Sequence, residues 1–216
     1  MDEQELLNQL QDKDVFFFDF DGTLINSEPY HKKAHELILK EFLGQDFVLT
    51  DEIFSRYIGR TDKEIYRMFK EDFNLNFDEK QMPKKKVDLA KELLLKNNVK
   101  TFKYFNSLAS NLKDKEFYIL SNQDYDLLVE SLKQNGIFEC FKEIFSLPKM
   151  DVKKDFFISN VSNFVDVQNK KIVIFEDSNK YLSLARENGM FAVGVETLIN
   201  KGTLSSANII INCEKE

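Results

Sequence analysis

The chain has 216 residues, a net charge of −7 and an apolar fraction of 43%, with 21 phenylalanines. This length and composition predict one or two globular domains with a sizeable core. The acidic balance excludes a general attraction to nucleic acid or anionic membranes, and no apolar run is long enough to span a bilayer. Cys140 and Cys213 follow no disulfide or metal spacing, and residues 1–10 are too polar for a signal peptide. We therefore expect a cytoplasmic protein.

After a short amphipathic helix within residues 1–10, the valine and phenylalanine run at 15–18 predicts a buried strand. It ends in Asp19, Asp21 and Gly22. Residues two apart in a strand point to one side, so the two carboxylates would repel each other unless a cation lies between them. This arrangement suits Mg²⁺ and a carboxylate nucleophile. A plain acidic turn and a calcium loop are alternatives, although the glycine spacing does not fit the calcium loop.

For residues 29–98 the hydrophobic pattern predicts several successive helices and no strand. Thr61 and Glu64 have the spacing of a capping box at a helix start. A further helical region is expected from residue 78, with Pro83 as an interruption. This segment is therefore expected to be an all-helical insertion.

Beyond residue 98, strands and helices alternate. The expected strands are residues 117–120, 144–147, 171–175, 191–195 and 209–211, and the expected helices are 105–112, 125–135, 155–165 and one that ends at 189. Alternation of this kind predicts a parallel sheet with helices on both faces. We therefore expect an α/β fold: a doubly wound parallel-sheet, Rossmann-like core of residues 1–28 and 99–216, with an inserted helical cap of residues 29–98.

The segment Asp19-Phe20-Asp21-Gly22-Thr23-Leu24, followed by Ser27-Glu28 and His31, resembles the first motif of the haloacid dehalogenase (HAD) superfamily. More narrowly, it resembles the β-phosphoglucomutase and phosphoglycolate-phosphatase-like branch. The expected layout also resembles the HAD fold, which has a helical cap after its first motif, so the resemblance covers nearly the whole chain. It implies that Asp19 attacks phosphorus to form an aspartyl-phosphate, and that Asp21 serves first as an acid and then as a base.

One more strand end and one helix start carry candidate phosphate-binding residues, and sites of open α/β sheets lie beyond the carboxyl ends of the strands. Ser121-Asn122 resembles the second HAD motif, which implies phosphoryl binding, whereas the alternative is a serine that caps the next helix. The third motif is represented by a lysine pair. Lys153 is the first candidate and Lys154 the alternative, to hold the phosphate and the nucleophile together.

Glu176-Asp177, after the strand at 171–175, resembles the fourth HAD motif. The resemblance implies that Mg²⁺ is held by Asp177, by Asp19 and by the backbone carbonyl of Asp21, with Glu176 as a second acidic ligand or one that acts through water. Acidic residues at this position, directly after a buried strand, suit a hard cation.

The helical segment offers weaker candidates for substrate contacts. The resemblance implies substrate contacts for Glu28, His31 and Arg60, with an acid role as a further alternative for His31, but each is also compatible with an ordinary surface or loop residue. His31 and His35 are one helical turn apart, a zinc-like spacing, yet no third ligand is evident in the sequence.

The favoured prediction is an Mg²⁺-dependent phosphatase that acts on a small phosphorylated metabolite, as a monomer or weak dimer. A sugar-phosphate mutase has the same chemistry, but it needs a cap that holds a second phosphate. A non-catalytic regulatory protein on the same scaffold would be expected to lack one of the catalytic groups. A dehalogenase is disfavoured because that branch lacks the second aspartate.

Overall fold

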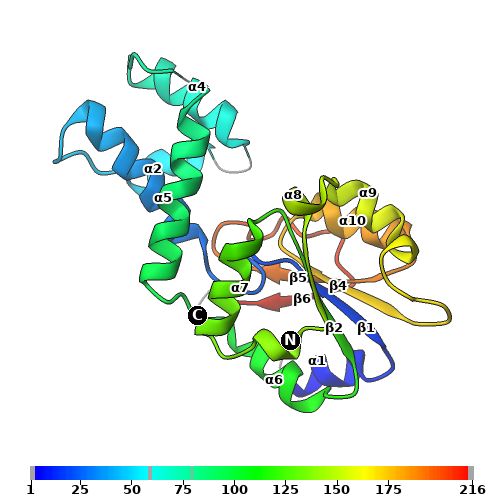
Figure 1. Cartoon of the computed structure of the whole chain (residues 1–216). Helices are drawn as coiled ribbons and strands as arrows, with labels where there is room; N and C mark the ends of the chain where they lie inside the picture. The colour runs from blue at the N-terminus through cyan, green and yellow to red at the C-terminus, as the bar shows by residue number, and fades with distance from the viewer. Residues whose placement is uncertain (1–2, 58–59, 79, 214–216) are drawn as a thin grey trace. The chain divides into compact units, whose positions relative to one another are not determined.

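The structure is a computed structural model that describes residues 3–57, 60–78 and 80–213. The chain divides into two compact units, which are drawn in Figure 1. The first contains Met1–Asn26 and Asn98–Glu216, and the second is Ser27–Asn97. The second unit begins two residues before the expected start at residue 29 and ends one residue before the expected end at residue 98, so it includes Glu28.

The first unit is built on a six-stranded sheet in the order β3-β2-β1-β4-β5-β6, in which every neighbouring pair is parallel. The strands are β1 (Val15–Phe18), β2 (Glu116–Ser121), β3 (Glu143–Ser146), β4 (Ile172–Glu176), β5 (Phe191–Glu196) and β6 (Ile209–Asn212). In chain order, β2 and then β3 are added on one side of β1. The next strand, β4, pairs with the other side of β1. In such sheets, ligands bind beyond the strand ends at the point of reversal.

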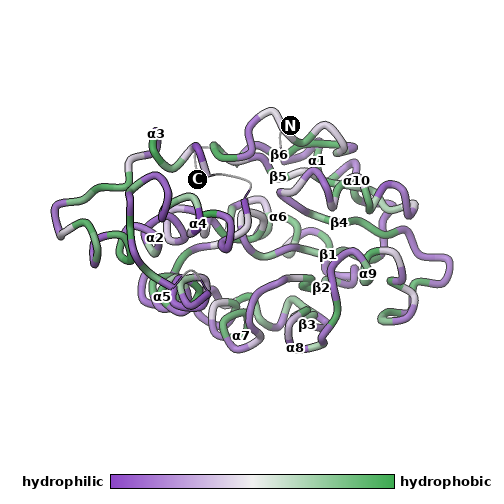
Figure 2. The backbone as a smooth tube through the Cα atoms, turned by 90° about the horizontal axis from the view of Figure 1, so that it is seen from above, coloured by the Kyte–Doolittle hydropathy of each residue, from purple (hydrophilic) through white to green (hydrophobic). Residues whose placement is uncertain are grey.

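All four residues of β1 are buried, because helices cover both faces of the sheet. Phe17 packs on one face with Phe157 of α9 (Lys154–Ser159), at a ring-centroid distance of 5.8 Å. Phe18 packs on the other face with Phe105 of α6 (Lys103–Asn111), at 5.3 Å. Figure 2 shows hydrophobic stretches along β1 and β4. Each buried phenylalanine contributes roughly 1.5–3 kcal/mol, so the central strand is firmly fixed.

The other helices of this unit are α1 (Glu3–Leu10), α7 (Tyr125–Gln134), α8 (Leu147–Met150) and α10 (Asn179–Glu187), with 3-10 turns at Phe138–Cys140 and Val161–Asn163. The helix expected over residues 155–165 is shorter, since α9 ends at Ser159. At this point the Asn160 side chain donates a 2.9 Å hydrogen bond to the carbonyl of Phe156. Asparagine side chains compete with the backbone in this way and favour helix ends.

The second unit contains α2 (Glu28–Leu43), α3 (Asp51–Phe54) with a 3-10 turn at Ser55–Tyr57, α4 (Asp62–Asp72) and α5 (Met82–Lys96). Its described residues include no strand, as expected. The capping box of Thr61 and Glu64 is present at the start of α4. The expectation that Pro83 interrupts a helix is wrong: Pro83 lies in the first turn of α5, where a missing N–H costs nothing.

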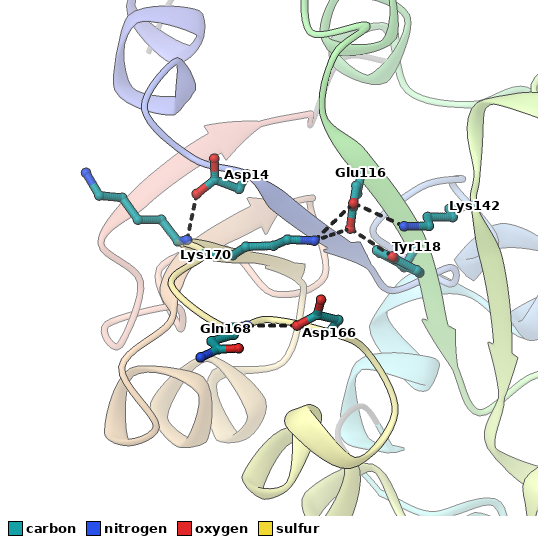
Figure 3. Close-up of polar contacts among 8 residues, drawn as sticks. Asp14, Glu116, Tyr118, Lys142, Asp166, Gln168 and Lys170 are labelled. Atoms are coloured by element: carbon teal, nitrogen blue, oxygen red, sulfur yellow. Dashed lines mark hydrogen bonds and ion pairs between the residues drawn. The ribbon is translucent and has the colours of Figure 1, made fainter.

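A polar network joins the amino ends of the central strands (Figure 3). Asp19 and Asp177 follow the opposite, carboxyl ends of β1 and β4. The Glu116 carboxylate accepts from Lys170 at 3.0 Å and from the Tyr118 hydroxyl at 3.0 Å, and it pairs with Lys142 at 3.1 Å. Asp14 accepts a 2.8 Å bond from the backbone N–H of Lys171. These contacts tie together the segments that lead into β1, β2 and β4.

Candidate active site

Three carboxylates meet where β1 and β4 end side by side. Asp19, Glu176 and Asp177 each offer an oxygen, and these oxygens all lie within 4.8 Å of one another. The register pairs Phe18 with Phe175, so the residues that follow them leave the sheet at the same level. Carboxylate oxygens gathered at this density suit a hard divalent cation.

Gly22 allows the loop after β1 to pass against Asp177. Its φ is +66°, which disfavours a side chain, and a Cβ at this position would overlap the Asp177 carboxylate. The loop is closed by a 3.0 Å bond from the N–H of Gly22 to the carbonyl of Ile25. Glycine therefore serves both the turn and the close approach of two acidic segments.

A buried lysine from the start of α9 lies against the cluster. The Lys154 ammonium is 2.8 Å from Asp19 Oδ1 and 2.5 Å from Glu176 Oε2. The other oxygen of Glu176 accepts from the N–H of Ser178 at 3.1 Å. Lys153, the first candidate from sequence, is exposed instead, so the structure favours Lys154 as the lysine of the site.

Burial and mutual repulsion act on these charges. Burial raises the pKa of Asp19 to about 7, with Glu176 and Asp21 adding to the rise and Lys154 opposing it. Burial likewise raises the pKa of Asp177, helped by Glu176 and Asp19. Burial disfavours the ammonium of Lys154, yet the two adjacent carboxylates raise its pKa. Among the described residues, only one lysine contacts these three clustered carboxylates, and the oxygen ligands of this set fit a bound Mg²⁺ ion.

Ser121 ends β2 and is buried, while Asn122 after it is exposed. The Ser121 Oγ accepts a 3.1 Å bond from the N–H of Gln123, which leaves its own hydroxyl hydrogen to be donated elsewhere. Asn122 lines a hollow of about 520 Å³, together with Lys153 and Lys154. All three are among the sequence candidates for phosphate binding.

Asp21 is half-buried and accepts a 2.6 Å hydrogen bond on Oδ2 from the side-chain amide of Gln123. Gln123 was not among the residues singled out from sequence, although it lies only two positions after Ser121. The only sequence signal for Gln123 is its position two residues after Ser121, which is the last residue of β2.

Two further residues lie next to the acidic cluster, and neither was a predicted site residue. The ring of Tyr181 lies 4.9 Å from the Lys154 ammonium, within range of a cation–π contact. The side-chain amide of Asn200 donates to the carbonyls of Asp177 and Val195, both at 2.9 Å. It thereby joins the loops after β4 and β5 beside the acidic cluster.

Glu28, His31 and Arg60 lie in the second unit, and their contact with substrate stays a prediction. His35 is buried, with Nδ1 3.1 Å from the Tyr66 hydroxyl. Among the residues that the structure describes, the acidic cluster is the only group of three or more metal-ligating side chains. The zinc alternative at His31 and His35 therefore gains no third ligand there.

The family model of the haloacid dehalogenase-like hydrolases matches residues 16–195. The chain belongs to this family. Its expected fold, with a parallel-sheet core and a helical insertion, is confirmed. No helix among the described residues has the length and apolarity to cross a bilayer.

Solved structures of other haloacid dehalogenase-like proteins share the fold. A beta-phosphoglucomutase candidate from Thermotoga maritima is 18% identical, with a TM-score of 0.69 and coverage of 92% of this chain and 94% of that one. The HAD-hydrolase candidate YfnB from Bacillus subtilis, bound to magnesium, is 16% identical, with a TM-score of 0.68 and coverage of 92% and 94%. CbbY from Rhodobacter sphaeroides, in complex with phosphate, is 16% identical, with a TM-score of 0.67 and coverage of 92% and 93%. The search of curated proteins finds no match.

Proposed function

We propose that the chain is an Mg²⁺-dependent phosphatase that hydrolyses a small phosphorylated metabolite through an aspartyl-phosphate. The observation that carries the proposal is the meeting of Asp19, Asp177 and Glu176 within 4.8 Å, with Lys154 against Asp19. Family membership and the magnesium-bound and phosphate-bound relatives of the same fold support it.

Mg²⁺ would be held by Asp19, Asp177 and Glu176, with the backbone carbonyl of Asp21 as a further ligand. When bound, the ion supplies positive charge for the phosphoryl oxygens. Asn200 holds the backbone of Asp177, and Gly22 leaves room for its carboxylate. The ligands are thus fixed by the ends of two neighbouring strands and by the loops that follow them.

Asp19 is the proposed nucleophile. Lys154 contacts its Oδ1 and restricts the rotation of the carboxylate, while the Ser121 hydroxyl remains able to donate to a phosphoryl oxygen. In the first step a bond forms between an Asp19 oxygen and phosphorus as the ester oxygen leaves. Lys154 is well suited to neutralise the charge of the transferring group, and the Ser121 hydroxyl to donate a hydrogen bond to it.

Asp21 would provide the proton for the leaving oxygen. In the second step it would take a proton from water as that water attacks phosphorus, which breaks the bond to Asp19 and releases inorganic phosphate. The proton given in the first step is recovered in the second, so the enzyme returns to its starting state.

The test is hydrolysis of p-nitrophenyl phosphate and of a panel of metabolite phosphates with and without Mg²⁺. We expect turnover only with the ion, loss of turnover in Asp19→Asn, and a phosphorylated Asp19 by mass spectrometry after rapid quenching. Asp114→Asn serves as a control, because that carboxylate is exposed on the surface. Full activity in Asp19→Asn would overturn the mechanism. Conversion of glucose 1-phosphate with a bisphosphate activator would assign a mutase instead, and metal binding without turnover a regulatory protein.

A further inference from the structure

A glutamine that follows the second strand contacts the proposed acid and base directly. The Nε2 of Gln123 donates to Oδ2 of Asp21 at 2.6 Å. Both residues belong to the first unit, and they follow the neighbouring strands β2 and β1. The contact therefore bridges the carboxyl ends of two neighbouring strands, on the same side of the sheet as the acidic cluster.

The backbone of Gln123 is held on both sides. Its N–H donates to Ser121 Oγ at 3.1 Å, and its carbonyl accepts from Ser146 Oγ at 2.8 Å. Ser121 and Ser146 are paired in the register of β2 and β3, and each is only 1% exposed. Two buried hydroxyls at the ends of adjacent strands thus fix the base of the glutamine side chain.

This anchoring bears on proton transfer, because a general acid acts only when its oxygen lies within hydrogen-bond reach of the atom that takes the proton. A carboxylate at the start of a loop can rotate about its side-chain bonds. The amide of Gln123 holds Oδ2 of Asp21 and so restricts the rotation of this carboxylate. A neutral amide does this without adding a second ammonium next to Asp19.

We infer that Gln123 is a positioning residue that orients Asp21 for proton transfer to the leaving group. The inference rests on the proposed phosphatase function. It predicts a defect that depends on the leaving group, because a poor leaving group such as an alkoxide needs the proton, whereas p-nitrophenolate leaves without it. A residue with a purely structural role would lower both activities by the same factor.

The experiment compares kcat/KM for an alkyl phosphate and for p-nitrophenyl phosphate in the wild-type chain, Gln123→Met and Gln123→Glu. Methionine keeps the length of the side chain without the donor, and glutamate keeps its shape but repels Asp21. We expect kcat/KM for the alkyl ester to fall by about 10- to 100-fold, and that for the nitrophenyl ester by less than about threefold. KM for either ester should change little.

Gln134→Met is the matched control, since Gln134 also donates to a carboxylate, that of Glu130, but outside the site. Ser146→Ala, which frees the carbonyl of Gln123, should give a weaker defect of the same kind. Equal losses for both esters in folded Gln123→Met and Gln123→Glu, or no loss for either, would overturn the inference. Absence of hydrolysis in the wild-type chain would instead reject the phosphatase proposal, so the two failures can be told apart.

Discussion

Gly22 and Asp177 approach each other so closely that the position of a Cβ on the glycine is already taken by the aspartate carboxylate. This relationship joins the first and the fourth motif of the chain. It explains why the loop after β1 carries a glycine directly after its second aspartate.

The first prediction concerns this contact. Gly22→Ala should destabilise the fold by about 1–2 kcal/mol through its left-handed φ, and it should also weaken Mg²⁺ binding by displacing Asp177. Gly136→Ala is a matched control, because Gly136 has a φ of +69° but no heavy atom within 4 Å of a Cβ. Urea unfolding and calorimetric titration with Mg²⁺ measure the two effects. If both variants bind Mg²⁺ like the wild-type chain, the close approach is not needed.

The second prediction separates the two adjacent lysines. Lys154→Met should lower kcat by about 100-fold or more, because the ammonium next to Asp19 is lost. Lys153→Met should leave kcat within about twofold, since this side chain is exposed. Steady-state kinetics with p-nitrophenyl phosphate gives the comparison.

Because Lys154 is buried between two carboxylates, its loss should also cost about 3 kcal/mol of stability. Lys154→Arg, which keeps the charge, serves as a second variant if Lys154→Met does not fold. A larger kinetic defect in folded Lys153→Met than in folded Lys154 variants would reverse the assignment.

The third prediction concerns pH and the second unit. Burial lowers the pKa of His35 to about 3, with the charges of Lys86 and His31 acting in the same direction. The unfolded chain binds a proton at about pH 6.5 and the folded chain does not, so stability is full above pH 6.5. It should fall by roughly 1 kcal/mol per pH unit as pH drops from about 6.5 toward 3.

The 3.6 Å contact between His35 Nε2 and Asp62 is therefore not an ion pair at neutral pH, and Asp62 pairs with Lys86 at 3.2 Å instead. His35→Phe removes the titrating group while keeping a ring among Phe54 and Phe69. Denaturant unfolding followed from pH 7 to pH 4 should show a smaller loss of stability in this variant. Identical slopes for the two proteins would contradict a neutral His35.

The fourth prediction concerns the network in Figure 3. Burial opposes ionisation of Glu116, but hydrogen bonds from Lys170, Lys142 and Tyr118 lower its pKa overall. A lowered folded pKa adds stability that is present above the unfolded value and is lost as pH falls through the folded one. Glu116→Gln should therefore cost about 1–2 kcal/mol at pH 7 and progressively less in acid.

Glu139→Gln is the control for this variant, because Glu139 is exposed. Activity should be unchanged in Glu116→Gln at pH 7, since Glu116 lies at the amino ends of the strands. A stability loss that stays constant from pH 7 to pH 3 would show that the charge of Glu116 is not the cause.

Much of the fold could be predicted from the sequence because its strands are short, apolar and separated by helical patterns. Val15–Phe18 is hydrophobic throughout, as expected of a strand covered on both faces. Prediction failed where local chemistry sets a helix end. Pro83 lies in the first turn of α5 rather than interrupting a helix, and the side chain of Asn160 ends α9 early.

The acidic cluster could also be anticipated, because Asp19 and Asp177 follow the carboxyl ends of two adjacent parallel strands. The choice between Lys153 and Lys154 depends on which residue begins α9, and sequence patterns locate helix ends only to within a few residues. The amide of Gln123 was missed for a different reason. Its role depends on a contact across two strands, and no local pattern marks such a contact.

The central strand β1 remains without its partner strands during much of protein synthesis. β1 pairs with β2 and β4, so its partners leave the ribosome only after about a hundred and about a hundred and sixty further residues have been added. The helical unit has all of its residues once Asn97 is made, whereas the phenylalanine-rich strand remains unpaired. A nascent chain is thus expected to expose Val15–Phe18 as a site for chaperones or for aggregation until β4 emerges.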